Sequence, residues 1–110
     1  MPVKGQWEIW SARLWHEDET SKVRPVVIIL DEGEGAECQV FRITSQVKSN
    51  RYAYEIKRWK EAGLDKKSMI ILEPAYIRHE DFGRYIGTLD PLDIYGLTES
   101  IKHGAYGSMF

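Results

Sequence analysis

The chain has 110 residues, of which 43% are hydrophobic and 29% charged, a single cysteine and a formal net charge of −2. These values exclude a separate cofactor domain, an internal disulfide and a four-cysteine zinc site, and they argue against a general nucleic-acid binder with a basic surface. No apolar stretch reaches the roughly 18 residues of a spanning helix and the start MPVKGQWEIW lacks a signal peptide's apolar core, so we expect one domain over residues 1–110, in the cytoplasm and without a membrane partner.

The first half of the chain predicts three strands. Residues 6–14 alternate between apolar and polar side chains, which indicates a half-buried strand. The polar, acidic residues 16–23 predict a loop, and PVVIIL at 25–30 predicts a central strand covered on both faces. After a turn at 31–35, residues 38–45 predict a third strand.

The second half predicts shorter strands and one helix. The expected strands are residues 52–56, 68–73, 76–78 and 84–89, with a helical turn at 57–62 that Gly63 closes. Asp90 before Pro91 is typical of a helix start, and Lys102 with His103 suits a last turn. Gly96 inside this helix costs about 1 kcal/mol relative to alanine. Many short strands with one helix at the end predict a mainly β, α+β fold: a small, strongly bent sheet or barrel.

Charge is distributed unevenly along the chain. Residues 16–37 contain seven acidic side chains against Lys22 and Arg24, whereas residues 42–67 contain eight basic side chains against three acidic ones. This asymmetry predicts either one basic face or solvated loops whose charges average out in space.

Familiar catalytic motifs are missing. The sequence contains no phosphate-binding glycine loop, no nucleophile elbow and no zinc-protease motif. A metal site at His79, Glu80 and Asp81 is disfavoured because adjacent strand side chains point to opposite faces. Cys38 is interpreted as a small strand residue rather than a nucleophile.

A series of short motifs remains, in a fixed order. They are EIW, K-x-R-P-V-V-I-I-L, ITSQ, DKKSMIILE and FGRYIGTLDP before the final helix. Together, over about Trp7 to His103, they resemble the MazF/PemK family of toxin endoribonucleases. The resemblance implies an SH3-like barrel of the CcdB/MazF/PemK kind, a homodimer, a cognate antitoxin protein as partner, and metal-independent cleavage of single-stranded RNA without a cofactor.

The resemblance also assigns site residues. The arginine before the proline and the threonine of the third strand are the family's catalytic pair, and these positions are Arg24 and Thr44 here. Weaker candidates for substrate contact are Ser45, Gln46, Lys22, Lys48 and Arg51.

The implied chemistry is consistent with those residue types. Metal-free RNA cleavage uses the ribose 2′-hydroxyl as nucleophile, so the protein needs none of its own. A guanidinium can meet two oxygens of the charged phosphorane, and a threonine hydroxyl can donate to the same group. Arginine stays protonated and is a poor base, which leaves the general base open; His16, Glu17 and Asp18 are available.

Other interpretations remain. Arg24 can simply pair with Glu17 or Asp18, and threonine is common in strands for its β propensity alone. The family's first loop usually carries glycines, whereas HEDETSK has none. The competing functions are a non-enzymatic inhibitor of the gyrase-poison type on the same fold, as in CcdB, and an inactive barrel that binds RNA or protein.

Overall fold

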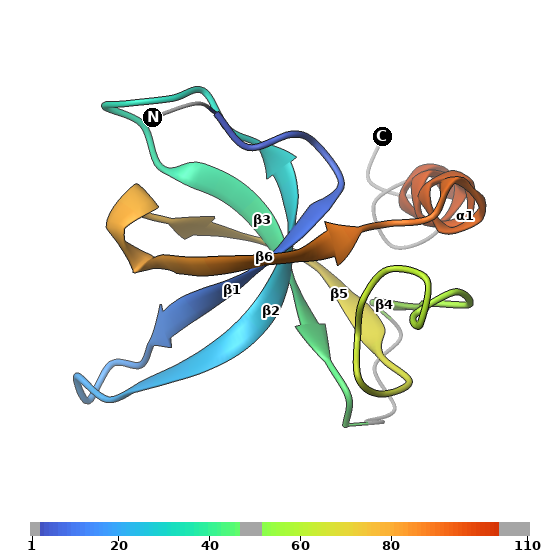
Figure 1. The fold of residues 1–110 in the computed structure, drawn as a ribbon, viewed down its shortest axis with the longest axis horizontal. Helices are drawn as coiled ribbons and strands as arrows, with labels where there is room; N and C mark the ends of the chain where they lie inside the picture. The colour runs from blue at the N-terminus through green and yellow to red at the C-terminus, as the bar shows by residue number, and fades with distance from the viewer. Residues whose placement is uncertain (1–2, 47–51, 104–110) are drawn as a thin grey trace.

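A computed structural model describes residues 3–46 and 52–103 of the chain. Its elements are β1 (Glu8–Trp15), β2 (Ser21–Leu30), β3 (Cys38–Thr44), β4 (Ala53–Glu55), β5 (Met69–Ile77), the short 3-10 helix η1 (His79–Asp81), β6 (Phe82–Thr88) and α1 (Pro91–His103). The strands form one antiparallel sheet in the order β4-β5-β3-β2-β1-β6 (Figure 1). The predicted fold class, mainly β with a C-terminal helix, is confirmed, although β4 and β6 remain two ends of the described sheet rather than closing a barrel.

The strand β2 lies inside the sheet and is buried on both faces, as its sequence predicts. Val26, Val27 and Ile28 are all fully buried. Val27 joins a core cluster on one face with Phe41 and Ile43, whereas Val26 and Ile28 join a second cluster on the other face. The alternation of side chains along a strand therefore divides the core into two parts, one on each side of the sheet.

The beginning of β2 differs from the prediction. The strand starts at Ser21, which pairs with Trp15, so residues 21–23 of the predicted loop belong to a β1–β2 hairpin. Lys22 and Val23 are exposed there. The loop prediction was wrong at these positions because the hairpin extends beyond the core, where no apolar face marks the strand.

The strand β5 is also longer than predicted. Residues 68–73 and 76–78 were expected as separate strands, but β5 runs continuously through Pro74. Proline lacks a donor and is tolerated where one edge of a strand is free. The edge strand β4 pairs only with Met69–Ile71, so no β4 residue pairs with β5 at Pro74.

The helix α1 has the predicted bounds and is held by a buried carboxylate. Asp90 caps its first turn by accepting a hydrogen bond from Leu92 N at 2.9 Å. Asp93, which is 0% exposed, accepts hydrogen bonds from Tyr54 Oη (2.7 Å), Lys57 N (2.8 Å) and Arg58 N (2.8 Å). Burial and the adjacent Asp93 raise the pKa of the Tyr54 phenol. These bonds fix α1 against β4 and the segment that follows it (Figure 1). No helix among the described residues is long and apolar enough to cross a membrane.

The segment after β4 packs closely on β6. The predicted helical turn is present as consecutive turns, with Ala62 N donating to Arg58 O at 3.1 Å, and Gly63 ends it with a φ of 91°. A Cβ on Gly87 would overlap the Ala62 carbonyl oxygen, so the two backbones touch without side chains between them. This contact places residues 63–68 beside β6, where they form one wall of the site.

Candidate active site

A hollow of about 700 Å³ opens where β2 begins and β3 ends. We call it the Arg24 hollow; it is lined by Ser11, residues 22–25, residues 43–46, residues 63–66, Ser68, Arg84 and Ile86. Each wall comes from a different part of the chain, and the β6 side is held by the close backbone contact at Gly87. The hollow is the larger of the two described in this structure.

Five of the seven predicted site residues line this hollow. They are Arg24, Thr44, Ser45, Gln46 and Lys22. Lys48 and Arg51 lie outside the described residues. The structure therefore brings together the short motifs around Arg24 and Thr44, which are twenty residues apart in sequence.

Arg24 and Thr44 are related by strand register. Val26 pairs with Arg42 across the antiparallel β2–β3 ladder. The ladder ends at this pair, and the same register continued by two residues would bring Arg24 opposite Thr44. Both residues line the Arg24 hollow, so a phosphate group bound there has both side chains near it.

The guanidinium of Arg24 is available to a ligand. Arg24 is exposed and donates a hydrogen bond from Nη1 to the carbonyl of Val23 at 3.1 Å. Among the described residues no carboxylate pairs with it. Asp18 accepts instead from Thr20 N and Thr20 Oγ1, bonds that lower the pKa of its carboxyl. The interpretation of Arg24 as an ion-pair partner of Glu17 or Asp18 is therefore wrong.

Thr44 shapes the end of β3. Its Oγ1 accepts a hydrogen bond from Gln46 N at 3.2 Å, which turns the chain after the strand. A hydroxyl that accepts one bond can still donate its own proton. Thr44 is half-buried, whereas Ser45 and Gln46 are exposed.

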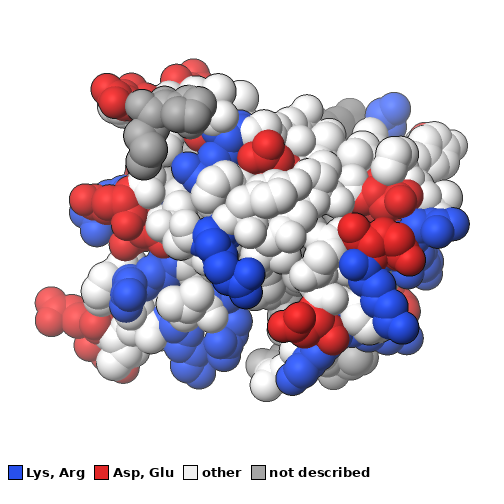
Figure 2. Space-filling model, viewed as in Figure 1, with Lys and Arg blue, Asp and Glu red and all other residues white. Residues whose placement is uncertain are grey.

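The Arg24 hollow carries an excess of positive charge. Its charged lining residues are Lys22, Arg24, Lys66, Arg84 and Asp65. Four cations against one carboxylate favour an anionic ligand, although the whole chain has a net charge of −2. The face of the molecule in Figure 2 carries charges of both signs around a broad uncharged area.

Several lining residues were not predicted from the sequence. Ser11, Asp65, Lys66 and Arg84 reach the hollow from β1, from the segment before β5 and from β6. The FGRY motif contains Arg84, but the sequence did not indicate that this side chain would line the same hollow as Arg24. Only the packing of β6 against β1 and the segment at 62–63 places these side chains near Arg24.

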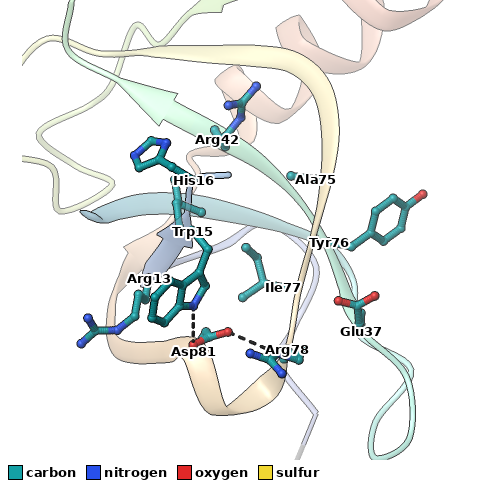
Figure 3. Close-up of a pocket in the computed structure, with 11 residues that line it drawn as sticks. Arg13, Trp15, His16, Glu37, Arg42, Ala75, Tyr76, Ile77, Arg78 and Asp81 are labelled. Atoms are coloured by element: carbon teal, nitrogen blue, oxygen red, sulfur yellow. Dashed lines mark hydrogen bonds and ion pairs between the residues drawn. The ribbon is translucent and has the colours of Figure 1, made fainter. Parts of the chain in front are cut away.

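A smaller hollow of about 330 Å³ lies elsewhere on the sheet. We call it the Trp15 hollow; Figure 3 shows Trp15 Nε1 donating to Asp81 Oδ1 (3.2 Å), with Arg78 paired to the same carboxylate (3.6 Å). His16 lines this hollow and not the Arg24 hollow. A general base from His16 is therefore not supported by its position.

Cys38, His79 and Asp31 are other titratable groups among the described residues. Burial and the charge of Asp31 raise the pKa of the Cys38 thiol to about 11, so it is protonated at neutral pH and is not a nucleophile. His79 Nε2 lies 2.8 Å from Asp31 Oδ1. Within residues 3–46 and 52–103, no group of three or more His, Cys, Asp or Glu side chains could hold a metal ion.

Comparison with known proteins identifies clear relatives. Residues 5–103 match the model of the family described as PemK-like, MazF-like toxin of type II toxin-antitoxin system. The Mycobacterium tuberculosis toxin MazF-mt6 is 28% identical with a TM-score of 0.68, over 86% of this chain and 92% of that one.

Two further solved structures share the fold at 11% identity. An endoribonuclease from Mycobacterial species has a TM-score of 0.70, over 93% of this chain and 90% of that one. An endoribonuclease in complex with its cognate antitoxin, also from Mycobacterial species, has the same TM-score, over 93% and 92%. No curated protein matches the chain.

Proposed function

The chain belongs to the PemK-like, MazF-like toxins of type II toxin–antitoxin systems, and from this premise we propose that it is an endoribonuclease that cleaves single-stranded RNA without a metal ion. The observation that carries the proposal is the juxtaposition of Arg24 and Thr44 in one cationic hollow. An anionic backbone suits such a hollow, and the opposed side chains suit one phosphate.

In the proposed reaction the ribose 2′-hydroxyl attacks the adjacent phosphorus. The bond from phosphorus to the 5′-oxygen of the next nucleotide breaks, the 2′-hydroxyl loses its proton and the 5′-oxygen gains one, leaving a 2′,3′-cyclic phosphate. Because DNA has no 2′-hydroxyl, it is not a substrate. Hydrolysis of the cyclic product would give a 3′-phosphate.

Arg24 and Thr44 have separate roles in this proposal. The permanently charged guanidinium of Arg24 stabilises the extra negative charge of the phosphorane, a role that a metal ion fills in other nucleases. Thr44 donates a hydrogen bond from its hydroxyl to the same phosphate, and Ser45 and Gln46 contact the substrate beside it. Pro25 biases Arg24 towards the extended backbone that points it into the hollow.

The partners follow from family membership and are proposals as well. A relative of the same fold is described in complex with its cognate antitoxin. We propose that this chain also has a cognate antitoxin, that it acts in the cytoplasm, and that it works as a homodimer.

The first test is cleavage of a long single-stranded RNA in EDTA, with the fragment ends mapped. Wild-type protein should produce discrete cuts with cyclic phosphate or 3′-phosphate ends. Arg24→Ala should produce none, whereas Arg78→Ala, an exposed arginine of the Trp15 hollow, should cut as wild type does. Intact RNA across a broad set of sequences would contradict the proposal. A gyrase-type inhibitor or an inactive barrel that binds without cutting would then be the better description.

A further inference from the structure

The strand β6 carries a bulge at the edge of the Arg24 hollow. Trp10 pairs with Tyr85 and Ala12 pairs with Phe82 across the β1–β6 ladder. Between these pairs β1 has one residue, Ser11, whereas β6 has two, Gly83 and Arg84. Such a bulge changes the direction of the side chains on the longer strand, and bulges are frequent beside active sites.

The residues at the bulge fit one another closely. Arg84 N donates a hydrogen bond to Ser11 Oγ at 2.8 Å. A Cβ on Gly83 would overlap the same oxygen, so glycine leaves room for the Ser11 hydroxyl in this position. The serine and the glycine together fix the backbone from which the Arg84 side chain extends.

The bulge places Arg84 on the β6 side of the hollow that Arg24 lines from β2. Both arginines line the hollow, one from β6 and the other from β2. The strand β1 lies between them, and Ala12, which pairs with Arg24, directly follows Ser11. Two strand spacings separate the two backbones by roughly 10 Å.

Arg84 has no partner that would explain this position. Its side chain is exposed, and among the described residues it forms no ion pair and no side-chain hydrogen bond. Asp65 is the one carboxylate among the described lining residues, and it faces four cations. An arginine held on a fixed backbone at the rim of a cationic hollow is suited to bind a phosphate.

We propose that Arg84 binds the RNA phosphate neighbouring the scissile one, and that Ser11 and Gly83 position it through the bulge. This inference rests on the proposed ribonuclease function. In this proposal Arg24 and Thr44 bind the scissile phosphate, and Arg84, which lines the same hollow from a different strand, binds the neighbouring one. Arg84 therefore fixes the register of the RNA and strengthens its binding without entering the chemical step.

The test uses the full chain and RNA oligonucleotides that span the mapped cut. A 2′-deoxy substitution at the cut prevents cleavage, and each phosphate in turn is replaced by an uncharged methylphosphonate. Wild-type protein should bind about tenfold more weakly to the RNA in which the phosphate contacted by Arg84 is a methylphosphonate. Arg84→Gln should bind this substituted RNA as well as it binds the unsubstituted RNA. A methylphosphonate at the scissile phosphate should still weaken the binding of Arg84→Gln.

Salt dependence gives a second, independent measurement. One phosphate contact in a single strand contributes about 0.7 to the slope of log affinity against log salt. Arg84→Gln should make this negative slope shallower by about 0.7. It should also raise KM about tenfold, with kcat nearly unchanged. Arg84→Lys keeps the charge and should retain the slope. Arg58→Gln, at an exposed arginine outside the hollow, should leave the slope and KM as in wild type.

Positioning by the bulge is tested with Ser11→Ala. This variant should raise KM and weaken the effect of the neighbouring methylphosphonate, and combining it with Arg84→Gln should add nothing further. If Arg84→Gln shows the same methylphosphonate profile as wild type, the inference is overturned even when the wild type cleaves RNA. If the wild type neither cleaves nor binds RNA, the proposed function fails instead.

Discussion

Arg24 and Thr44 each lie two residues beyond Val26 and Arg42, the last pair of the β2–β3 ladder at this end, and both line one hollow. Neither side chain belongs to the hydrophobic core, since Arg24 is exposed and Thr44 is half-buried. Substitutions at these positions therefore test chemistry separately from folding.

Arg24→Ala should remove cleavage while leaving the fold intact. Loss of one donor that stabilises transition-state charge lowers rates by about 100-fold to 1000-fold in other enzymes. Because Arg24 is exposed, the free energy of unfolding should change by less than about 0.5 kcal/mol. Cleavage rates in EDTA and urea unfolding measure the two effects. A variant that cuts at the wild-type rate would exclude Arg24 from the reaction.

Thr44→Val should lower the cleavage rate by roughly 10-fold to 100-fold, the value of a hydrogen bond to a charged group. Valine has nearly the shape of threonine but cannot donate to the phosphate or accept from Gln46 N. Thr44→Ser is the matched control because it keeps the hydroxyl, and it should recover most of the activity. Wild-type activity in Thr44→Val together with a loss in Thr44→Ser would mean that the methyl group, not the hydroxyl, is required.

Asp93→Ala should destabilise the protein by about 4 kcal/mol, because it removes a fully buried carboxylate and leaves three partly buried donors without their acceptor. Urea unfolding measures this loss, with the exposed Asp65→Ala as control, expected within about 0.5 kcal/mol of wild type. If Asp93→Ala does not fold, Tyr54→Phe removes one of the three bonds and should cost about 1 kcal/mol. Wild-type stability in Tyr54→Phe would contradict the role of this cluster.

Asp31 should make stability depend on pH in the acid range. Burial opposes its ionisation, but hydrogen bonds from Lys4 N, His79 and Gly33 N outweigh burial and lower its pKa from 3.8 to about 2. A pKa below the unfolded value means that ionised Asp31 stabilises the fold above about pH 4. This contribution, about 2 kcal/mol, is lost as the pH falls from 3.8 to about 2.

The measurement for Asp31 compares wild type with Asp31→Asn by urea unfolding between pH 2 and pH 5. The difference between their unfolding free energies should shrink as the pH falls, because asparagine does not titrate. Exposed carboxylates titrate in both proteins and cancel in the difference. A difference that stays constant over this range would show that Asp31 has no special role.

The helix illustrates what the sequence predicts well. Asp90 with Pro91 marks the start, and Lys102 with His103 marks the end, because capping is local chemistry. From the sequence, Gly96 is expected only to destabilise this helix. The structure gives the reason for it, since a Cβ there would overlap the Tyr54 hydroxyl that donates to Asp93. A contact over such a sequence distance leaves no local signature.

The candidate site was predicted only in part, for the same reason. Arg24 and Thr44 lie in short motifs whose order the family resemblance interprets. Ser11 and Arg84 join them through a bulge that arises when β6 pairs with β1, and neither strand shows it alone. Pro74 shows the converse error, because a proline that usually ends a strand lies inside β5 where the neighbouring edge is free.

The Arg24 hollow is assembled from segments that are far apart along the chain, from Ser11 on β1 to Ile86 on β6. During synthesis on the ribosome, residues 11–46 emerge first and carry Arg24 and Thr44 without the wall formed by residues 63–68 and β6. A nascent chain, or a fragment that ends before Arg84, therefore holds the two proposed catalytic residues on an open pair of strands. The complete site exists only after the chain has been made through β6 and has folded.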